Sequence, residues 1–131
     1  MNSNNGQSDS QTHIAELKQL VAEFVSQRDW EQFHSPKNLA MSISIEAAEL
    51  MEHFQWLTCE QSQQPDSESL DQIRLELADA LCYCLGLANQ LDIDVSQAMH
   101  DKMKLNRTKY PVEEIRGRFG HDDTINDRAD S

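Results

Sequence analysis

The chain has 131 residues, a length that fits one folded domain and leaves little room for a second core. Its 23 acidic residues outnumber its 11 basic residues, and the formal net charge is -12 at pH 7. A surface this acidic repels phosphate backbones, so general binding to nucleic acid is disfavoured. No segment approaches the roughly 18 consecutive apolar residues of a membrane span, and residues 1–11 lack the regions of a secretory signal. We therefore expect a cytoplasmic protein with no nucleic-acid or membrane partner, whose excess carboxylates either solvate the surface or converge on a cation.

The composition favours helices, because the chain has only four Gly and three Pro between long runs rich in Ala, Leu, Glu, Gln and Met. Apolar periodicity and capping signals predict four long helices and one short turn, over about 12–28, 35–57, 68–91, 94–110 and 112–116. Ser35-Pro36 is a typical N-cap followed by proline at the first helical position. Asp94 with Gln97 resembles a capping box. A polar linker over 58–67 separates the second helix from the third.

Four helices with short connections predict an all-α fold, a four-helix bundle. The folded domain is expected over 12–116, between disordered tails over 1–11 and 117–131 that have little apolar content. The second and third helices are apolar around more than half of their circumference, which exceeds what four helices of one chain would cover. We therefore expect subunits to pair through these helices.

The three cysteines, Cys59, Cys82 and Cys84, have no spacing that suggests disulfides. On a helix, Cys82 and Cys84 point about 200° apart and cannot both bind one metal ion. We expect small reduced side chains in or near the core, as in a reducing compartment.

Two pairs of acidic residues stand at i, i+3 spacing in the second and third helices: Glu46 with Glu49, and Glu76 with Asp79. The members of each pair lie about 60° apart on one face, at the edge of an apolar stripe. Packing the two stripes together would bring four carboxylates to one partly buried site, where they could not stay close unpaired. Oxygen-only ligands favour a hard divalent cation, Mg²⁺ or Mn²⁺. The alternative is that these acids are solvated helix faces, which the same spacing also fits.

A competing metal motif is incomplete. Glu31 and His34 have the Glu-x-x-His spacing of di-iron bundles, which need two such motifs on helices together with further glutamates. This motif precedes the Ser-Pro that opens a helix, and His100 has Gln97 at the matching position. The pattern therefore disfavours a di-iron site.

The two acid pairs, with 26 residues between them, resemble the signature of the MazG-type all-α nucleoside triphosphate pyrophosphohydrolases. Further blocks resemble the dCTP pyrophosphatase branch of this family. They are Arg-Asp-Trp-Glu-Gln-Phe-His with Ser-Pro-Lys-Asn-Leu over 28–39, Phe-Gln-Trp over 54–56, and the basic segment with Lys-Tyr-Pro over 102–111. Together the blocks cover nearly the whole predicted domain.

The resemblance implies hydrolysis between the α- and β-phosphates of a nucleoside triphosphate, which gives the monophosphate and pyrophosphate. It implies a homodimer or homotetramer with sites near the subunit interfaces. It implies that Mg²⁺ is held by the catalytic carboxylates Glu46, Glu49, Glu76 and Asp79. It implies substrate binding by Trp30, His34, Lys37, Asn38, Trp56, Tyr83, Lys102, Asn106, Arg107, Lys109 and Tyr110.

One position departs from the branch. A His that contacts the base usually stands about one helical turn before the Arg-Asp-Trp segment, and Val21 occupies that position here. The departure bears on the preference for cytosine more than on the chemistry.

Some of these residues have simpler interpretations. The basic residues concentrated between Lys102 and Arg116 could hold the β- and γ-phosphates, or could only reflect the preference for cations near a helix C-terminus. Trp30 and Trp56 could stack on a base or pack in the core. The chain has no G-x-G-x-x-G or Walker-type loop, so nucleotide chemistry would depend on the bound cation and these side chains.

Two functions remain open from the sequence. The first is a pyrophosphohydrolase that acts on dCTP or modified dCTP and cleans the nucleotide pool. The alternative is a non-catalytic module that senses nucleotides or docks a basic protein on its acidic helices. The aromatic and basic blocks beside the acid pairs favour the enzyme, because a docking surface needs neither.

Overall fold

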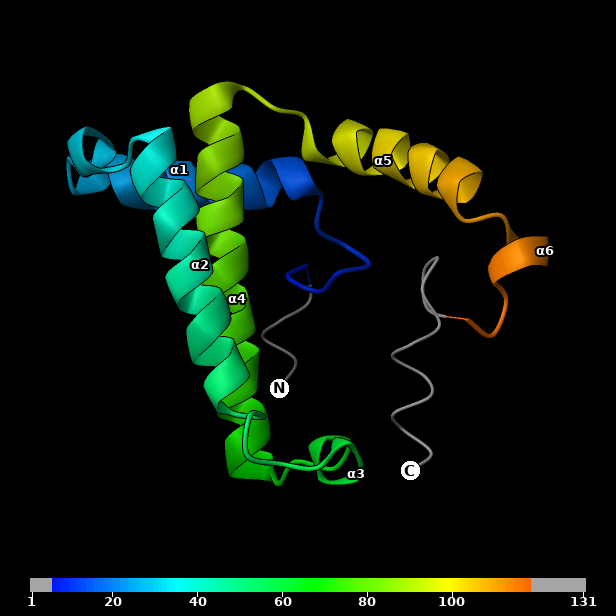
Figure 1. Cartoon of the computed structure of the whole chain (residues 1–131). Helices are drawn as coiled ribbons and strands as arrows, with labels where there is room; N and C mark the ends of the chain where they lie inside the picture. The colour runs from blue at the N-terminus through cyan, green and yellow to red at the C-terminus, as the bar shows by residue number, and fades with distance from the viewer. Residues whose placement is uncertain (1–5, 119–131) are drawn as a thin grey trace. The chain divides into compact units, whose positions relative to one another are not determined.

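The computed structural model describes residues 6–118, and all regular secondary structure among them is helical. The elements are α1 (Ile14–Gln27), η1 (Glu31–Phe33), α2 (Pro36–Glu52), α3 (Cys59–Ser62), α4 (Ser67–Leu91), α5 (Val95–Lys109) and α6 (Val112–Ile115) (Figure 1). The four long helices and the short turn expected from the sequence are confirmed as α1, α2, α4, α5 and α6, but the expected end of the second helix at about 57 is wrong, because α2 ends at Glu52 and the chain continues in turns. The tails over 1–11 and 117–131 stay predictions, and residues 1–5 and 119–131 lie outside the described part of the chain.

The chain divides into two compact units, with the boundary between Ile93 and Asp94. In the first unit, α2 and α4 lie side by side over most of their length and α1 packs across α4 (Figure 1). The second unit contains α5 and α6. Three of the four long helices therefore pack in the first unit, and the fourth belongs to the second.

Side-chain caps begin the long helices where the sequence predicts. Ser35 Oγ accepts a hydrogen bond from the Asn38 backbone N–H at 3.2 Å, and Pro36 follows as the first residue of α2. At the start of α5, Asp94 accepts a hydrogen bond from the Gln97 N–H at 2.8 Å. The Gln97 side chain donates instead to Asp101, so only half of the predicted capping box forms.

A complete capping box occurs where the sequence analysis expected only a polar linker. The Gln61 N–H donates to Thr58 Oγ1 at 3.1 Å, and the Thr58 N–H donates to Gln61 Oε1 at 3.0 Å. These two bonds satisfy N–H groups at the start of the short helix α3.

Two hydrogen bonds fix α1 against the C-terminal end of α4. The Asn89 side chain donates to the Lys18 carbonyl oxygen at 3.0 Å, and Lys18 Nζ donates to the Ile93 carbonyl oxygen at 2.7 Å. Asp92, the residue after α4, has a left-handed backbone with φ 53° and ψ 47°. The chain therefore leaves the helical path at Asp92, between the two residues, Asn89 and Ile93, that bond to α1.

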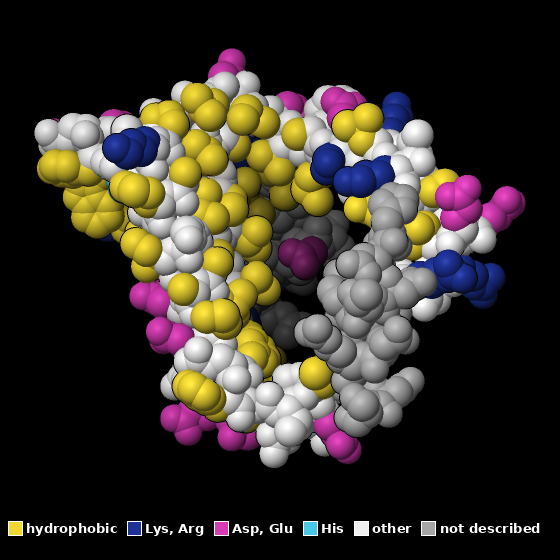
Figure 2. Space-filling view, in the orientation of Figure 1, with side chains coloured by type: hydrophobic (Ala, Val, Ile, Leu, Met, Phe, Trp, Pro, Cys, Tyr) yellow, Lys and Arg dark blue, Asp and Glu magenta, His cyan; other side chains and the backbone are white. Residues whose placement is uncertain are grey.

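The first unit buries little and exposes much apolar surface. Among the described apolar side chains, only Leu39 and Ala88 are buried. Leu70, Leu77 and Leu81, which share one face of α4, are each about half exposed. Figure 2 shows hydrophobic side chains gathered over the face that α2 and α4 present to the viewer. The excess of apolar surface expected from the sequence is thus present on the folded chain.

No helix within residues 6–118 combines the length and the hydropathy that crossing a bilayer requires.

Candidate functional site

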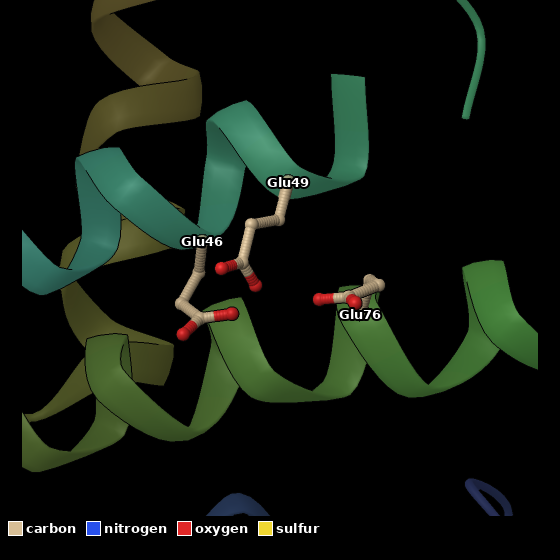
Figure 3. Close-up of side chains that lie close together, drawn as sticks. All are labelled: Glu46, Glu49 and Glu76. Carbon is tan, nitrogen blue, oxygen red and sulfur yellow. The ribbon is translucent and has the colours of Figure 1, made fainter. Parts of the chain in front are cut away.

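Three carboxylates converge between α2 and α4. Glu46 and Glu49 extend from α2 and Glu76 from α4, and one oxygen of each lies within 4.8 Å of the others (Figure 3). Glu46 follows the buried Leu39 by seven residues, about two turns, so both lie on the face of α2 that packs towards α4. Both acid motifs therefore contribute to one cluster, with Glu46 and Glu49 from the first motif and Glu76 from the second.

The carboxylates in this cluster are poorly solvated and repel one another. Glu46 Oε2 and Glu76 Oε2 are both buried without a hydrogen-bond partner. Desolvation is the main cause that raises the pKa of Glu46, followed by a side-chain hydrogen bond and the charge of Glu49. Desolvation also dominates the raised pKa of Glu76, followed by the charges of Glu49 and Asp79. The folded chain therefore concentrates negative charge at this cluster, and the charge of His53 offsets it only in part, by lowering the pKa of Glu76.

This donor set fits a hard divalent cation. Two buried carboxylate oxygens without partners are costly unless a cation or a proton satisfies them. All three side chains offer oxygen, the ligand type that suits Mg²⁺ and Mn²⁺. Asp79, the fourth predicted ligand, lies outside the group of three, but its charge raises the pKa of both Glu46 and Glu76. Asp79 is therefore within electrostatic reach of the cluster.

A pocket of about 370 Å³ begins beside the cluster, because Asp79 is one of the residues that line it. Its wall contains a chain of aromatic rings. The ring centroids are 5.7 Å apart for Phe24 and Trp30, 6.2 Å for Trp30 and His34, and 6.4 Å for His34 and Tyr83. Most of the remaining lining is aliphatic. A volume of this size is within the range of small-molecule sites, and the aromatic wall suits a flat ring.

The aromatic segment between α1 and α2 is held by backbone geometry and local hydrogen bonds. Asp29 has a left-handed φ of 53°, and the Trp30 N–H returns to the Val25 carbonyl oxygen at 3.1 Å. The Asn38 side chain donates to the Phe33 carbonyl oxygen at 3.1 Å, which fixes the segment to the start of α2. These contacts direct Trp30 and His34 to the pocket.

Four predicted site residues line this pocket: Trp30, His34, Asp79 and Tyr83. Val21 lines it too, as expected from the position of the family His. Three other predicted site residues belong to the same unit as the pocket but do not line it: Lys37, Asn38 and Trp56. Trp56 is 87% exposed beyond the end of α2. The remaining five, Lys102, Asn106, Arg107, Lys109 and Tyr110, belong to the second unit, in which Lys109 Nζ lies 5.3 Å from the centre of the Tyr110 ring.

Sequence reasoning missed several lining residues. Leu20, Phe24, Val25, Leu39, Cys82 and Gly86 also line the pocket. Phe24 and Val25 lie on α1, for which the sequence analysis predicted a helix but no contact with a ligand. Desolvation and then the Asp79 charge raise the pKa of the Cys82 thiol. That side chain therefore contributes a neutral, weakly polar surface to the pocket.

Residues 41–118 match the family model of the MazG-like family, and this match contains both acid pairs. The chain belongs to the MazG-like family. It is 39% identical over 117 residues to dCTP pyrophosphatase 1 of Bos taurus. This match covers 82% of the present chain and 65% of the bovine protein. It is 41% identical over 107 residues to dCTP pyrophosphatase 1 of Mus musculus, with coverages of 79% and 62%. The chain thus spans slightly less than two thirds of the length of these curated relatives.

A solved structure with a similar fold comes from an archaeon. The crystal structure of a pyrophosphatase from Archaeoglobus fulgidus DSM 4304 superposes with a TM-score of 0.66 at 40% identity. The match covers 76% of this chain and 94% of the archaeal chain. The fold described above is therefore shared with that protein.

Proposed function

We propose that this chain is an Mg²⁺-dependent nucleoside triphosphate pyrophosphohydrolase that cleaves dCTP, or dCTP with a modified base, to the monophosphate and pyrophosphate. The observation that carries the proposal is the adjacency of two features. Three carboxylates with two buried, unpartnered oxygens stand beside a pocket walled by aromatic rings. The choice of dCTP is supported by the relatives, which are named dCTP pyrophosphatase 1. The proposed role is clean-up of the nucleotide pool.

In this proposal, Glu46, Glu49, Glu76 and Asp79 hold the metal ion. Bound Mg²⁺, with Mn²⁺ as a possible substitute, would offset the charge of the phosphates and lower the pKa of an attacking water. Glu49 is our candidate for the general base that accepts the proton of this water. The charge of Glu49 raises the pKa of both Glu46 and Glu76, so Glu49 acts on each of the other two carboxylates of the cluster.

We assign Trp30, His34 and Tyr83 to the base and sugar. Their rings follow one another at centroid separations of 6.2 and 6.4 Å, and the aliphatic lining excludes water around a bound base. Because Asp79 lines the same pocket, a base between these rings would leave the phosphates on the carboxylate side.

The phosphate contacts are assigned by charge and by the resemblance of the blocks. We propose Lys102, Asn106, Arg107, Lys109 and Tyr110 for this role, together with Lys37 and Asn38. Charge-assisted hydrogen bonds from the cationic members would stabilise the departing pyrophosphate. The Asn38 side chain already donates to Phe33, so its contribution would be to position the aromatic segment.

We also propose that the chain works as a homodimer or homotetramer. The half-exposed stripe Leu70, Leu77 and Leu81 is a larger apolar surface than a stable monomer needs to expose. Trp56, 87% exposed and outside its own chain's pocket, would then be available to the site of a second copy. Sedimentation at micromolar concentration should give a dimer or tetramer, and a monomer would contradict this proposal.

Two further assignments complete the proposal. The three free cysteines, Cys59, Cys82 and Cys84, suit a reducing compartment, and we propose the cytoplasm. We propose 12–116 as the folded enzymatic domain.

The test is a panel of the ribo- and deoxyribonucleoside triphosphates, each incubated with Mg²⁺ and with EDTA, followed by identification of the products. We expect pyrophosphate with Mg²⁺, the highest kcat/KM for dCTP or its modified forms, and no turnover with EDTA. Pyrophosphate from none of the nucleotides would refute the proposal. Mg²⁺-dependent binding without turnover would instead support a nucleotide sensor.

A further inference from the structure

His53 stands at the C-terminal end of α2, beside the carboxylate cluster, and has no role in the reaction as proposed above. It follows Glu46 by seven residues and Glu49 by four, about two turns and one turn, so its side chain lies on the same face of α2. The side chain is half-buried. Its charge lowers the pKa of Glu76, so the ring is within electrostatic reach of a carboxylate on the neighbouring helix. His53 is therefore on the side of α2 that faces α4.

The register of α2 and α4 places His53 at one end of the cluster. Near the start of α2, Leu39 Cδ2 lies 3.8 Å from the position that a Cβ of Gly86 would occupy. Ten residues further along α2, Glu49 lies beside Glu76, which is ten residues back along α4. The two helices are therefore antiparallel. His53, four residues beyond Glu49, lies about 6 Å further along α2, in the direction away from Gly86.

The aromatic pocket lies at the opposite end of the cluster. Its lining includes Tyr83 and Asp79 on α4 but not Glu76, which is one turn closer to the start of that helix. In the proposed reaction the base lies among the aromatic rings and the bond that breaks lies at the carboxylates. The β- and γ-phosphates would then extend beyond the cluster on the side away from the base. That is the side on which His53 lies.

The His53 ring is available to a ligand. Among residues 6–118 it forms no hydrogen bond or ion pair with another residue. Arg74, the basic residue of α4, precedes Glu76 by two positions and so points about 200° away from it. Arg74 instead pairs with Asp71 at 3.5 Å. An imidazole donates a hydrogen bond from one ring N–H when neutral and from two when protonated, so a contact with phosphate does not depend on its titration.

Building on the proposed function, we propose that His53 binds the β- and γ-phosphates of the substrate through hydrogen bonds from its ring to phosphate oxygens. The same contact holds the pyrophosphate as it leaves. A donor already in place where negative charge accumulates stabilises that charge as the bond between the α- and β-phosphates breaks. His53 would therefore add a phosphate contact from α2 to those assigned to the second unit.

The test is calorimetric titration of inorganic pyrophosphate and of dCMP, each with Mg²⁺, into the native chain, His53→Leu and His53→Gln. Leucine removes the donor, whereas glutamine retains an N–H. Since a hydrogen bond to a charged group is at stake, pyrophosphate should bind His53→Leu about 10-fold or more weakly than the native chain. His53→Gln should bind it more tightly than His53→Leu. The affinity for dCMP, which has no β- or γ-phosphate, should be the same for all three chains.

A matched control and a spectroscopic measurement exclude a merely structural effect. His13→Leu replaces an exposed histidine at the start of α1 whose side chain makes no cap, and it should bind both ligands as the native chain does. In the native chain, pyrophosphate should shift the NMR signals of the His53 ring and dCMP should not. Equal pyrophosphate affinity in the native chain and His53→Leu would overturn the inference. Equal losses of affinity for dCMP and pyrophosphate would also overturn it, because His53 would then act only through the carboxylates.

The titrations do not depend on turnover, so they separate this inference from the proposed function. If no triphosphate is hydrolysed but the expected affinities are found, the proposed function fails and His53 remains a phosphate contact. If dCTP is hydrolysed but His53→Leu binds pyrophosphate as the native chain does, only this inference fails. Absence of pyrophosphate binding to the native chain refutes it in either case.

Discussion

Replacing Leu39 by alanine tests whether the first unit depends on the one large side chain that is deeply buried among its described residues. Leu39 is 1% exposed, at the point where α2 meets α4, and its Cδ2 lies close to the backbone of Gly86. The substitution removes three carbon atoms, and at about 0.8 kcal/mol for each buried methylene group the transfer term is about 2.4 kcal/mol. Leu39 lines two pockets, of about 370 and 160 Å³, and the space left would open towards them, so the cavity term is small. We expect a loss of about 3 kcal/mol in the free energy of unfolding.

Urea unfolding followed by far-UV circular dichroism measures this loss. With a slope of about 1–3 kcal/mol per molar urea, the midpoint should fall by about 1–3 M. The control is Leu20→Ala, which removes the same atoms from a side chain that is 64% exposed and should cost about 1 kcal/mol or less. Both variants are compared at one protein concentration, because self-association adds to stability. Equal losses for Leu39→Ala and Leu20→Ala would refute the assignment of Leu39 as the core residue.

Three further predictions concern the capping residues and the carboxylate cluster. Ser35→Ala removes the acceptor of the Asn38 N–H and should lower the free energy of unfolding by about 1 kcal/mol in the same urea assay; an unchanged midpoint would contradict the cap. Asp92→Gly relieves a left-handed backbone and should stabilise the chain by about 0.5–1 kcal/mol in thermal unfolding, whereas a loss of stability would argue against that conformation. The pKa values of Glu46 and Glu76 are raised above the ordinary value of 4.5. The folded state therefore binds more protons than the unfolded state just above pH 4.5. As a result, the metal-free chain loses stability as the pH rises through this range. In EDTA, the thermal midpoint of Glu76→Gln minus that of the native chain should therefore increase as the pH rises above 4.5. A difference in midpoint that does not change with pH would contradict the clustered charge.

The helices and their starts were predictable because their signals are local. Ser35-Pro36 specifies the start of α2 through one side chain and one fixed backbone angle. The capping box of Thr58 and Gln61 is equally local, but it lies in a polar stretch without apolar periodicity. The sequence analysis therefore predicted a linker there and missed α3. Gln97 behaved differently, because Asp101 one turn later competes for its side chain.

The site was predictable in part. The spacing of Glu46, Glu49 and Glu76 was sufficient to predict that these carboxylates come together. The reason is that α2 and α4 pack along their apolar stripes and bring the three side chains close to one another. The apolar periodicity of α1 predicted only a helix, yet Phe24 and Val25 line the pocket. Periodicity identifies the apolar face of a helix but does not say whether that face meets protein or a ligand.

Other site residues depend on contacts that no pattern within one chain specifies. Trp56 belongs to a block that resembles the family, but it is exposed and outside its own chain's pocket.

The central claim is that the carboxylates of α2 and α4 hydrolyse a nucleoside triphosphate between its α- and β-phosphates. The most direct measurement is ³¹P NMR of dCTP incubated with Mg²⁺ and each of three proteins: the native chain, Glu49→Gln, and Glu52→Gln as the matched control on the exposed side of α2. Circular dichroism establishes equal helix content beforehand. We predict dCMP and pyrophosphate from the native chain and from Glu52→Gln, with turnover by Glu49→Gln slower by about 100-fold or more. Orthophosphate as the released product, or equal turnover by Glu49→Gln and Glu52→Gln, would contradict the account.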